Sequence, residues 1–486
     1  MANNSLGLPK INITFATSAS TAVFRSSRGK VALILNDPLY KDEDGVVMFS
    51  LKDSSELPMA GISKSNTELI YSALEGSPAE LFAFMIPPAE YEDERPVTTT
   101  SEVETTTTIQ SEVTVQSEVT VDTEVTVESE VTVTDPDTGE TSTQTSEVTV
   151  QSTTTVTSDV TVMSEVSVPT TTTVTGTTLS NVTVTATTTS LAALKEIALM
   201  KINYIAHPTG TYEDQKALAN FATAQRKNKK RTFKAVVANH AADSYSVINF
   251  TTSGIKVVNP DYTSAYEAAG GDVTLIPEEI PQYKTYTTTQ YTARIAGIAA
   301  GISLARSMTY YTLPEIVSVD SYDDPDEAVD NGELILIDEK DGLGVKIGRG
   351  VNSYVNFTDT EGEDFRFIKI VEGIDLIKDD ITANFRENYI GKVTNSYVNK
   401  KMLCTAINDY LAGLIGTVLD GTGGSSTNYV EIDPVANGKY AAAHGVDIDG
   451  MTEQDLLEIN TGVAVFLRGR LSMLNAMENL DIEFAL

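Results

Sequence analysis

A strict alternation of residue types over residues 96–190 limits what this chain can fold into. Up to the turn-like stretch Asp135–Gly139, every valine of this region sits at an odd position, and beyond that stretch every valine sits at an even position. A hexad, S-E-V-T-V-x, keeps the same phase from Ser111 to Val133 and again from Ser146 to Val168. Successive side chains of an extended chain point to opposite sides, so this period of two predicts β-structure with the valines on one face.

The composition of the same stretch allows a second interpretation. From Pro96 to Ser190 there are 14 acidic residues and no basic ones, and threonine, serine and valine make up most of the rest. Such a composition is typical of disordered segments, but a disordered linker has no reason to keep the phase of its valines. A single strand over the 23 residues Ser111–Val133 would span about 76 Å at ~3.3 Å per residue, too long for a compact domain. We therefore expect a surface-exposed inserted domain over 96–190, either a β-solenoid or short strands in a meander or sandwich.

The segments on both sides of the insertion predict one discontinuous α/β domain, formed by 26–95 and 191–320. Val31–Leu35 and Leu81–Ile86 are continuous apolar runs, typical of strands covered on both faces. The residues between these runs include a stretch with helical spacing, and strand, helix and strand in this order indicate a βαβ unit. Beyond the insertion, apolar residues at helical spacing predict a helix over 191–205.

A second domain is expected over residues 321–474, built on two amphipathic helices. Its apolar residues form two stripes at helical spacing: Ile370, Ile374, Ile377, Ile381 and Phe385 in the first helix, and Leu403, Ile407, Tyr410 and Leu414 in the second. Charged residues of the first helix, among them Glu372 and Asp375, are expected to face solvent. A hairpin with a D-G turn is predicted before these helices. The fold class is therefore an α+β multidomain protein with a β-rich insertion.

The charge balance argues against direct binding to nucleic acid. The chain has 68 acidic and 34 basic residues, a net charge of −34. Binding to phosphates needs clustered lysine and arginine, and the single basic cluster, Arg226–Arg231, is short. The most apolar window, Ala293–Ala305, is shorter than the about 20 residues that a membrane-spanning helix needs. Because the N-terminal residues lack a secretory pattern, we expect assembly in the cytoplasm, without a signal peptide and without a membrane partner.

No group of residues predicts a catalytic, cofactor-binding or metal-binding site. His207, His240 and His444 lie far apart in the sequence, without the spacing of metal ligands. The glycines of 342–350 belong to the predicted hairpin, which does not open into a helix as a phosphate-binding loop does. The single cysteine, Cys404, excludes an intrachain disulfide and is expected to be buried. An α/β region alone does not confer activity, so we expect a protein that is not an enzyme and that takes no cofactor.

Both ends of the chain carry a short alternating segment. Ile11, Ile13 and Phe15 alternate with polar residues near the N-terminus, and Leu480, Ile482 and Phe484 alternate with acidic and small residues at the C-terminus. A lone strand is not stable in water. Two interpretations remain open at this point: each segment pairs within its own subunit, or each is donated to the sheet of a neighbouring subunit. A further strand is predicted over Val463, Val465 and Leu467.

Three segments resemble the tail sheath proteins of contractile phages and phage-like bacteriocins. They are FRFIKIVEGI (365–374) with FRENYIGKVTN (385–395), ELILIDEKDGLGVKIGRGVNSYV (333–355), and the closing segment 461–486. The resemblance covers residues 304–486 well and 11–88 loosely. It does not extend to 97–189, so it implies nothing about the insertion.

The resemblance implies a structural subunit that forms stacked hexameric rings around a tail tube and contracts to drive the tube through a cell envelope. The expected partners are other copies of the chain, the tail tube protein, and the baseplate and tail terminator proteins, within a virion or bacteriocin tail. It also favours strand donation by an N-terminal arm (1–25) and a C-terminal arm (475–486). The donor residues would be Ile11, Ile13, Phe15, Leu480, Ile482 and Phe484, and the receiving strand would contain Val463, Val465 and Leu467.

A cell-surface or adhesin-like protein with a β-repeat stalk is the alternative from another class. The missing secretory pattern argues against it. So does the position of the repeat, which interrupts a predicted domain instead of following it.

Overall fold

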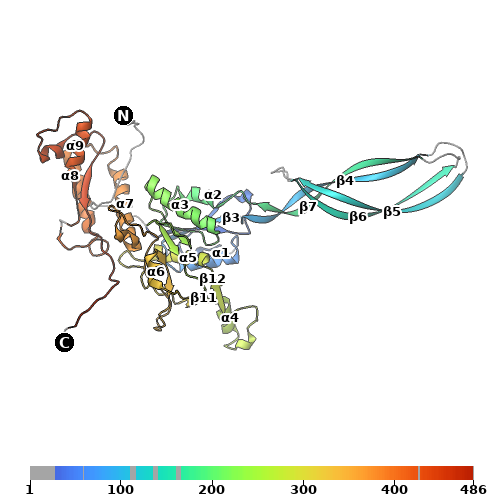
Figure 1. Cartoon of the computed structure of the whole chain (residues 1–486), viewed down its shortest axis with the longest axis horizontal. Coiled ribbons are helices and arrows are strands. Elements are labelled where there is room, and N and C mark those ends of the chain that lie inside the picture. Colours follow the sequence, from blue (N-terminus) through green and yellow to red (C-terminus); the bar gives the residue numbers. More distant parts are fainter. Residues whose placement is uncertain are drawn as a thin grey trace. The chain divides into compact units, whose positions relative to one another are not determined.

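The computed structural model describes residues 28–58, 60–109, 116–134, 141–159, 166–424 and 427–484. The chain divides into two compact units, an insertion formed by Ala89–Ala186 and a body formed by the residues before and after it. Figure 1 shows both units and labels their elements. The body mixes helices with sheets, as expected for the α+β class, and the insertion is built of strands.

The centre of the body is a seven-stranded sheet in the order β14-β10-β9-β8-β1-β3-β2. Its strands are β1 (Lys30–Asn36), β2 (Val47–Leu51), β3 (Glu80–Ile86), β8 (Tyr204–Ala206), β9 (Lys234–Ala238), β10 (Val247–Phe250) and β14 (Glu333–Leu334). All neighbours are parallel except β2 and β3. The parallel pairing of β1 with β3 confirms the predicted βαβ unit.

Helices cover both faces of this sheet, and the strand β1 shows why. Val31, Leu33 and Leu35 belong to one apolar cluster, together with residues of α1 (Lys64–Leu74) and α5 (Thr288–Gly301). Ala32 and Ile34 belong to a second cluster, with residues of α2 (Ser190–Ile197) and α3 (Tyr212–Lys229). A strand buried on both sides needs apolar residues at consecutive positions, which is the origin of the continuous apolar run.

Glycines allow α1 and α5 to approach each other closely. A Cβ atom on Gly297 would lie 2.0 Å from the carbonyl oxygen of Ala73, and one on Gly301 would lie 1.8 Å from that of Gly76. No real Cβ atom tolerates such a contact, so the two helices can cross at this distance only because these positions lack side chains.

The helix predicted over 191–205 is wrong in its second half. The helix α2 ends at Ile197, and Tyr204–Ala206 form the strand β8 between β1 and β9. The apolar residues of this segment satisfy both periodicities because it is short. The strand is favoured over the helix because it pairs with an edge of β1 on one side and an edge of β9 on the other.

Smaller elements complete the body around the main sheet. An antiparallel sheet has the order β12-β11-β13, and β15 pairs with β16 in the predicted hairpin. The bounds of these elements and of two nearby helices are β11 (Ile255–Val258), α4 (Pro260–Ala268), β12 (Tyr283–Tyr286), β13 (Ile316–Ser318), α6 (Pro325–Asp330), β15 (Leu336–Ile337) and β16 (Lys346–Ile347).

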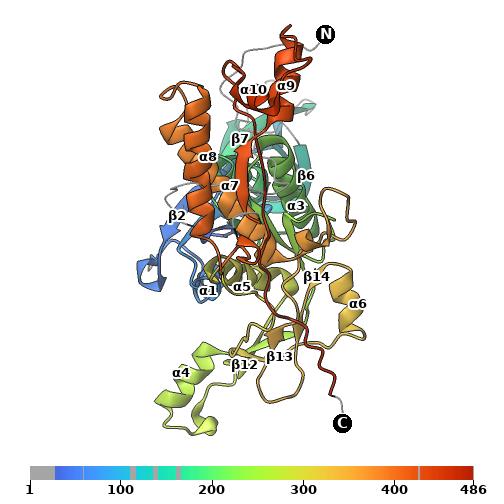
Figure 2. The same ribbon diagram turned by 90° about the vertical axis from the view of Figure 1, so that its left-hand side faces the viewer.

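A second core lies between the two predicted amphipathic helices, α7 (Ile368–Asn388) and α8 (Tyr397–Ala412). Leu403, Ile407 and Tyr410 of the predicted stripe are buried there with residues of α7. Two strands and two short helices follow α8 in the chain: β17 (Tyr429–Ile432), α9 (Pro434–Ala443), α10 (Glu453–Glu458) and β18 (Leu467–Arg470). Figure 2 shows α7 and α8 beside the strands and helices that follow them.

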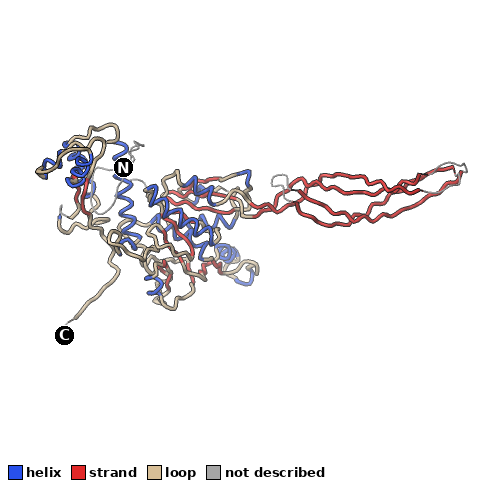
Figure 3. The backbone as a smooth tube through the Cα atoms, turned by 45° about the horizontal axis from the view of Figure 1, so that its top comes forward, coloured by secondary structure: helices blue, strands red, loops and turns tan. Residues whose placement is uncertain are grey.

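The insertion consists of two antiparallel strand pairs, which corrects the expected β-solenoid, meander or sandwich. The pairs are formed by β4 (Glu90–Ile109) with β7 (Val166–Thr185), and by β5 (Gln116–Thr134) with β6 (Thr141–Asp159). Figure 3 shows these long strands in red. Strands of this length were not expected for a compact domain. They pair in two-stranded antiparallel ladders, in which each strand bonds its partner along one edge.

One register runs through both pairs and explains the change of phase in the sequence. The numbers of partner residues add to the same odd total throughout, as for Glu90 with Thr185 and Gln116 with Asp159. An odd position therefore always faces an even one. The valines at odd positions before the turn-like stretch thus share a face with those at even positions after it, and Val125 lies opposite Val150.

Candidate functional site

The strands β17 and β18 form a two-stranded antiparallel ribbon on the surface of α8. Val430 and Ile432 of β17 are buried in the core that α7 and α8 share. The side chain of Asn408 on α8 covers the free edge of β17: its Nδ2 donates to the carbonyl oxygen of Val430 at 3.0 Å, and its Oδ1 accepts from the Val430 amide at 2.7 Å. The ribbon therefore has one face and one edge already occupied.

The other edge of the ribbon, along β18, is open. The register pairs Val430 with Gly469 and Ile432 with Leu467. The N–H and C=O groups of Val430 bond Asn408 and not Gly469, so Val430 and Gly469 are a non-hydrogen-bonded pair of the ladder. Ile432 and Leu467, two positions along, are a pair of the same kind. The N–H and C=O groups of Leu467 and Gly469 therefore point away from β17. Within the described part of the chain, no residue is seen bonded to them. An unpaired strand edge is a template for another strand.

The strand expected over Val463, Val465 and Leu467 begins later than predicted. Val463 lies in a turn with 96% of its surface exposed, Val465 precedes the strand, and β18 begins only at Leu467. The alternation of valines had suggested the earlier start. Thr461, whose side chain receives hydrogen bonds from Asn395 and Lys400, instead holds the chain in a turn at that point.

The C-terminal segment is fastened to the body as far as Asn479. The Leu474 amide donates to the carbonyl oxygen of Val418 at 2.8 Å. Glu478 accepts hydrogen bonds from Ser307 at 2.9 Å and Thr309 at 2.7 Å, and it forms an ion pair with Arg349 at 3.2 Å. These contacts fix the point from which the last residues leave the body.

Beyond Asn479 the chain extends away from the body, as Figure 1 shows for the C-terminal end. Leu480, Ile482 and Phe484 are 84%, 56% and 81% exposed. The strand predicted here is absent over the described residues 480–484, since a segment with no partner in its own subunit has nothing to pair with. The corresponding N-terminal residues Ile11, Ile13 and Phe15 lie outside the described residues.

A buried network of charges joins α7 to the main sheet. Arg226 of α3 holds Asp375 with two bonds, of 2.6 and 2.7 Å, and Lys234 of β9 contacts the same carboxylate at 2.8 Å. Glu372 lies 2.6 Å from Lys234 and 2.8 Å from Arg28. Both carboxylates had been expected to face solvent, but Asp375 is completely buried and Glu372 is 8% exposed.

Electrostatics keep this network ionised. Burial alone raises the pKa of Asp375, but Arg226 and Lys234 outweigh that effect and hold the pKa far below its ordinary value. The pKa of Asp379 is raised, because burial outweighs its contacts with Arg28 and Thr232. A buried pair of this kind is costly to break, since the remaining partner becomes an isolated buried charge.

A sequence signal for this network existed. Lys234 opens an otherwise apolar strand, and Arg226 occupies the face of α3 that carries the buried Leu218 and Ala222. Cations at positions that face a core indicate acidic partners, because a lone buried charge is unstable. Which carboxylates are those partners could be decided only by the packing of α7.

The described residues contain no cluster of metal ligands and no helix with the length and hydropathy of a membrane span. His207 is buried and His240 contacts Tyr212, while His444 stacks on Tyr440. Cys404 is buried as expected, and burial raises the pKa of its thiol to about 11.

Comparison with known proteins identifies relatives of the chain. No model of a known protein family matches it. The tail sheath protein of Clostridium phage phiCD119 is 30% identical over 291 residues, which cover 60% of this chain and 73% of that protein. An uncharacterized protein of Bacillus subtilis is 26% identical over 186 residues, covering 37% of this chain and 35% of the relative.

Solved structures show the same fold at lower identity. The helical sheath of the anti-feeding prophage in its contracted state has a TM-score of 0.54 and 12% identity, covering 99% of both chains. A sheath tail protein from Listeria innocua has a TM-score of 0.50 and 17% identity, covering 85% of this chain and 91% of that one. Together with the relative from the Clostridium phage, these likenesses show that the chain belongs to the family of phage tail sheath proteins.

Proposed function

We propose that this chain is the subunit of a contractile tail sheath. Copies would stack as hexameric rings around a tail tube, and shortening of the stack would drive the tube through a target cell envelope. The relatives support this proposal by name: one is a tail sheath protein, and another was solved as a helical sheath in a contracted state. The proposed role is structural, without catalysis or a cofactor, in the tail of a virion or bacteriocin particle.

One observation carries the proposal: the body presents an open strand edge and, separately, an exposed alternating segment. The edge is that of β18, and the segment contains Leu480, Ile482 and Phe484. Pairing of the segment of one copy with the edge of the next would satisfy the backbone of both, and the alternate side chains would set the register. Because each copy would donate one segment and offer one open edge, the same contact can repeat from subunit to subunit.

Such strand pairing suits an assembly that must move without coming apart. Subunits that rotate as rigid bodies break and remake their packing contacts. Because the contacts of Glu478 hold the chain against the body up to Asn479, the bend that follows this rotation would lie between Asn479 and the donated strand, while the ladder at β18 persists. We propose Leu480, Ile482 and Phe484 as donors, and β18 with the residues from Val463 to Leu467 as the receiving region. Donation by Ile11, Ile13 and Phe15 stays a prediction.

The tail tube protein and the baseplate and tail terminator proteins are the further partners that we propose, with no direct contact to nucleic acid. The division of the chain also stays a prediction. It comprises the arms 1–25 and 475–486, an α/β domain over 26–95 and 191–320, an inserted domain over 96–190, and a sheath domain over 321–474.

Removal of residues 480–486 tests the proposal. The shortened chain should stay folded, with an unchanged melting temperature, but should not assemble into tubes in negative-stain micrographs. A matched pair of variants separates the two faces of the segment: L480S/I482S/F484S should abolish assembly, whereas D481S/E483S should retain it. Tubes formed by the shortened chain would contradict strand donation at this end.

The open edge can be tested independently with proline, which lacks an N–H. Gly469→Pro removes a donor that points away from β17, so it should block assembly and leave the monomer folded. Arg468→Pro removes a donor inside the β17–β18 ladder, so it should destabilise the monomer itself. If Gly469→Pro assembles normally, β18 is not the receiving edge.

A further inference from the structure

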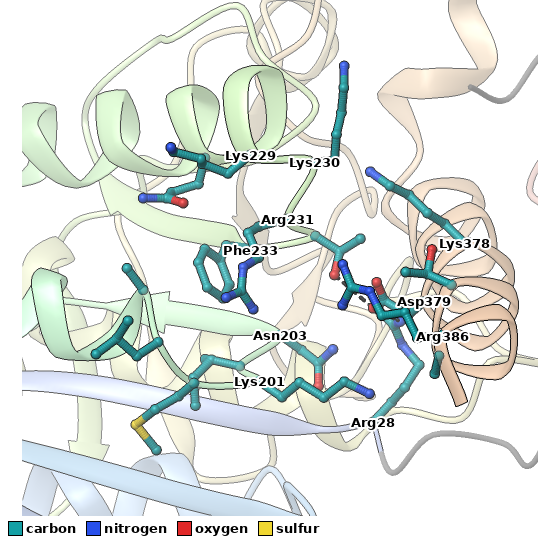
Figure 4. Close-up of a pocket in the computed structure, with 18 residues that line it drawn as sticks. Arg28, Lys201, Asn203, Lys229, Lys230, Arg231, Phe233, Lys378, Asp379 and Arg386 are labelled. Carbon is teal, nitrogen blue, oxygen red and sulfur yellow. Dashed lines mark hydrogen bonds and ion pairs between the residues drawn. The ribbon is translucent and has the colours of Figure 1, made fainter. Parts of the chain in front are cut away.

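A basic cavity lies between the end of α3 and the outer side of α7. Its volume is about 550 Å³. The cationic residues that line it come from four segments of the chain: Arg28, Lys201, Lys229, Lys230, Arg231, Lys378 and Arg386. Figure 4 shows Lys229 and Lys230 at the end of α3, with Lys378 and Arg386 on α7. In a chain with a net charge of −34, such a concentration of positive charge needs an explanation.

Apart from Arg28, which pairs with Glu372 and Asp379, most of these cations have no acidic partner within the described part of the subunit. Asp379 is the single carboxylate among the lining residues, and it already pairs with Arg28 at 3.2 Å and accepts a hydrogen bond from Thr232 at 2.8 Å. For Lys229, Lys230 and Arg386, no ion pair is formed with any other described residue. Counting the described residues alone, the cavity therefore carries more positive charge than its own subunit neutralises.

The helix dipole explains only part of this arrangement. Cations in the last turn of a helix complement its negative end, which accounts for Lys229 of α3. It also accounts for Arg386, which lies in the last turn of α7. It does not account for Lys378, which lies in the middle of α7 and lines the same cavity. Lys378 is also partly buried, and burial lowers its pKa, so an approaching anion would relieve an unfavourable environment.

We propose that this cavity is a contact site for carboxylate side chains of a second copy of the chain. The proposal rests on the proposed function, because a sheath subunit meets other copies on several sides. A copy of the chain has 68 acidic and 34 basic residues, so it offers a neighbour's cavity twice as many carboxylates as cations. Complementary charge of this kind orients the partner and sets the register of the contact.

Charge reversal tests the site. K229E/K230E should lower the melting temperature of the monomer only slightly, because both side chains are exposed and only the favourable charge at the end of α3 is lost. It should raise the lowest concentration for assembly roughly tenfold, since attraction becomes repulsion. K229R/K230R keeps the charge and should assemble like the wild type. K256E/K439E changes the net charge equally at exposed positions outside the cavity and serves as the matched control. Equal effects of K229E/K230E and the control would overturn the proposal.

Cross-linking identifies the partner directly. A carbodiimide joins an amine to a carboxylate only where the two are in contact. In tubes assembled from a mixture of ¹⁴N- and ¹⁵N-labelled subunits, we expect links from Lys229, Lys230 or Lys378 to carboxylates of mixed isotopic origin. Links confined to one copy, or tubes without links from these lysines, would overturn the site and leave the sheath function standing. A wild-type chain that forms no tubes would instead contradict the proposed function.

Discussion

The body and the insertion use long-range strand pairing in opposite ways. In the body, β1 lies between parallel neighbours, and both of its faces are covered by helices. In the insertion, strands of 19 and 20 residues pair two by two, in one constant register. The fold of the body depends on the burial of apolar side chains, whereas the strand register of the insertion depends on the phase of a sequence repeat. Substitutions should therefore act strongly and locally in the body, and weakly in the insertion.

The largest effect is expected from the buried charges of the body. Asp375→Ala leaves Arg226 and Lys234 buried without their shared partner, and should cost about 3–5 kcal/mol of unfolding free energy. Glu431→Ala removes the exposed ion pair with Arg468 and should cost less than about 1 kcal/mol. Urea unfolding of the two variants measures the difference. Equal losses would show that the network does not fasten α7.

Acid should weaken the body through His207. Burial lowers the pKa of this side chain to about 4, below the ordinary value of about 6.5. The unfolded chain then binds the proton first, so stability is full above pH 6.5 and falls as the pH drops toward 4. The loss attributable to this residue should approach about 3 kcal/mol. His207→Gln should flatten that part of the curve of unfolding free energy against pH, and an unchanged slope would contradict the prediction.

A smaller effect is expected inside the insertion. The register places Glu128 directly opposite Glu147, and like charges in facing positions destabilise a strand pair. Glu128→Lys should therefore slow amide hydrogen exchange in β5 and β6, by an amount equivalent to about 0.2–1 kcal/mol. Ser129→Lys, one position along, faces Ser146 and is the control. Faster exchange in Glu128→Lys would contradict the register.

The smallest effect on the body should come from deleting the insertion altogether. The amide of Ala186 donates to the carbonyl oxygen of Ala89 at 2.8 Å, so a short Gly-Ser loop can join the two ends. We expect the unfolding free energy of the body to change by no more than about 0.5 kcal/mol, as for surface changes away from the core. A body that fails to fold without the insertion would show that the two units are not independent.

Sequence periodicity predicted elements wherever one pattern is long or buried on both sides. The stripe of Leu403, Ile407 and Tyr410 is buried as expected, and the apolar runs at β1 and β3 form parallel strands. Periodicity failed where a segment was short, as in β8, because three residues fit a helix and a strand equally well. It also failed for Glu372 and Asp375, since a pattern of polarity does not distinguish a solvated carboxylate from a buried paired one.

By itself, the sequence determined the local geometry of this protein: which faces of its helices are apolar, and that the valines of each half of the repeat lie on one side of an extended chain. These properties follow from the helical and extended periods of the backbone. Only the tertiary structure decided which strand edges have no partner strand and which charges have no partner of opposite sign. The open edge of β18, the exposure of Leu480–Phe484 and the unneutralised cations beside α7 each depend on whether a distant segment reaches them. Contacts between residues far apart in the chain leave no local pattern, so the periodicity of neighbouring residues cannot predict them.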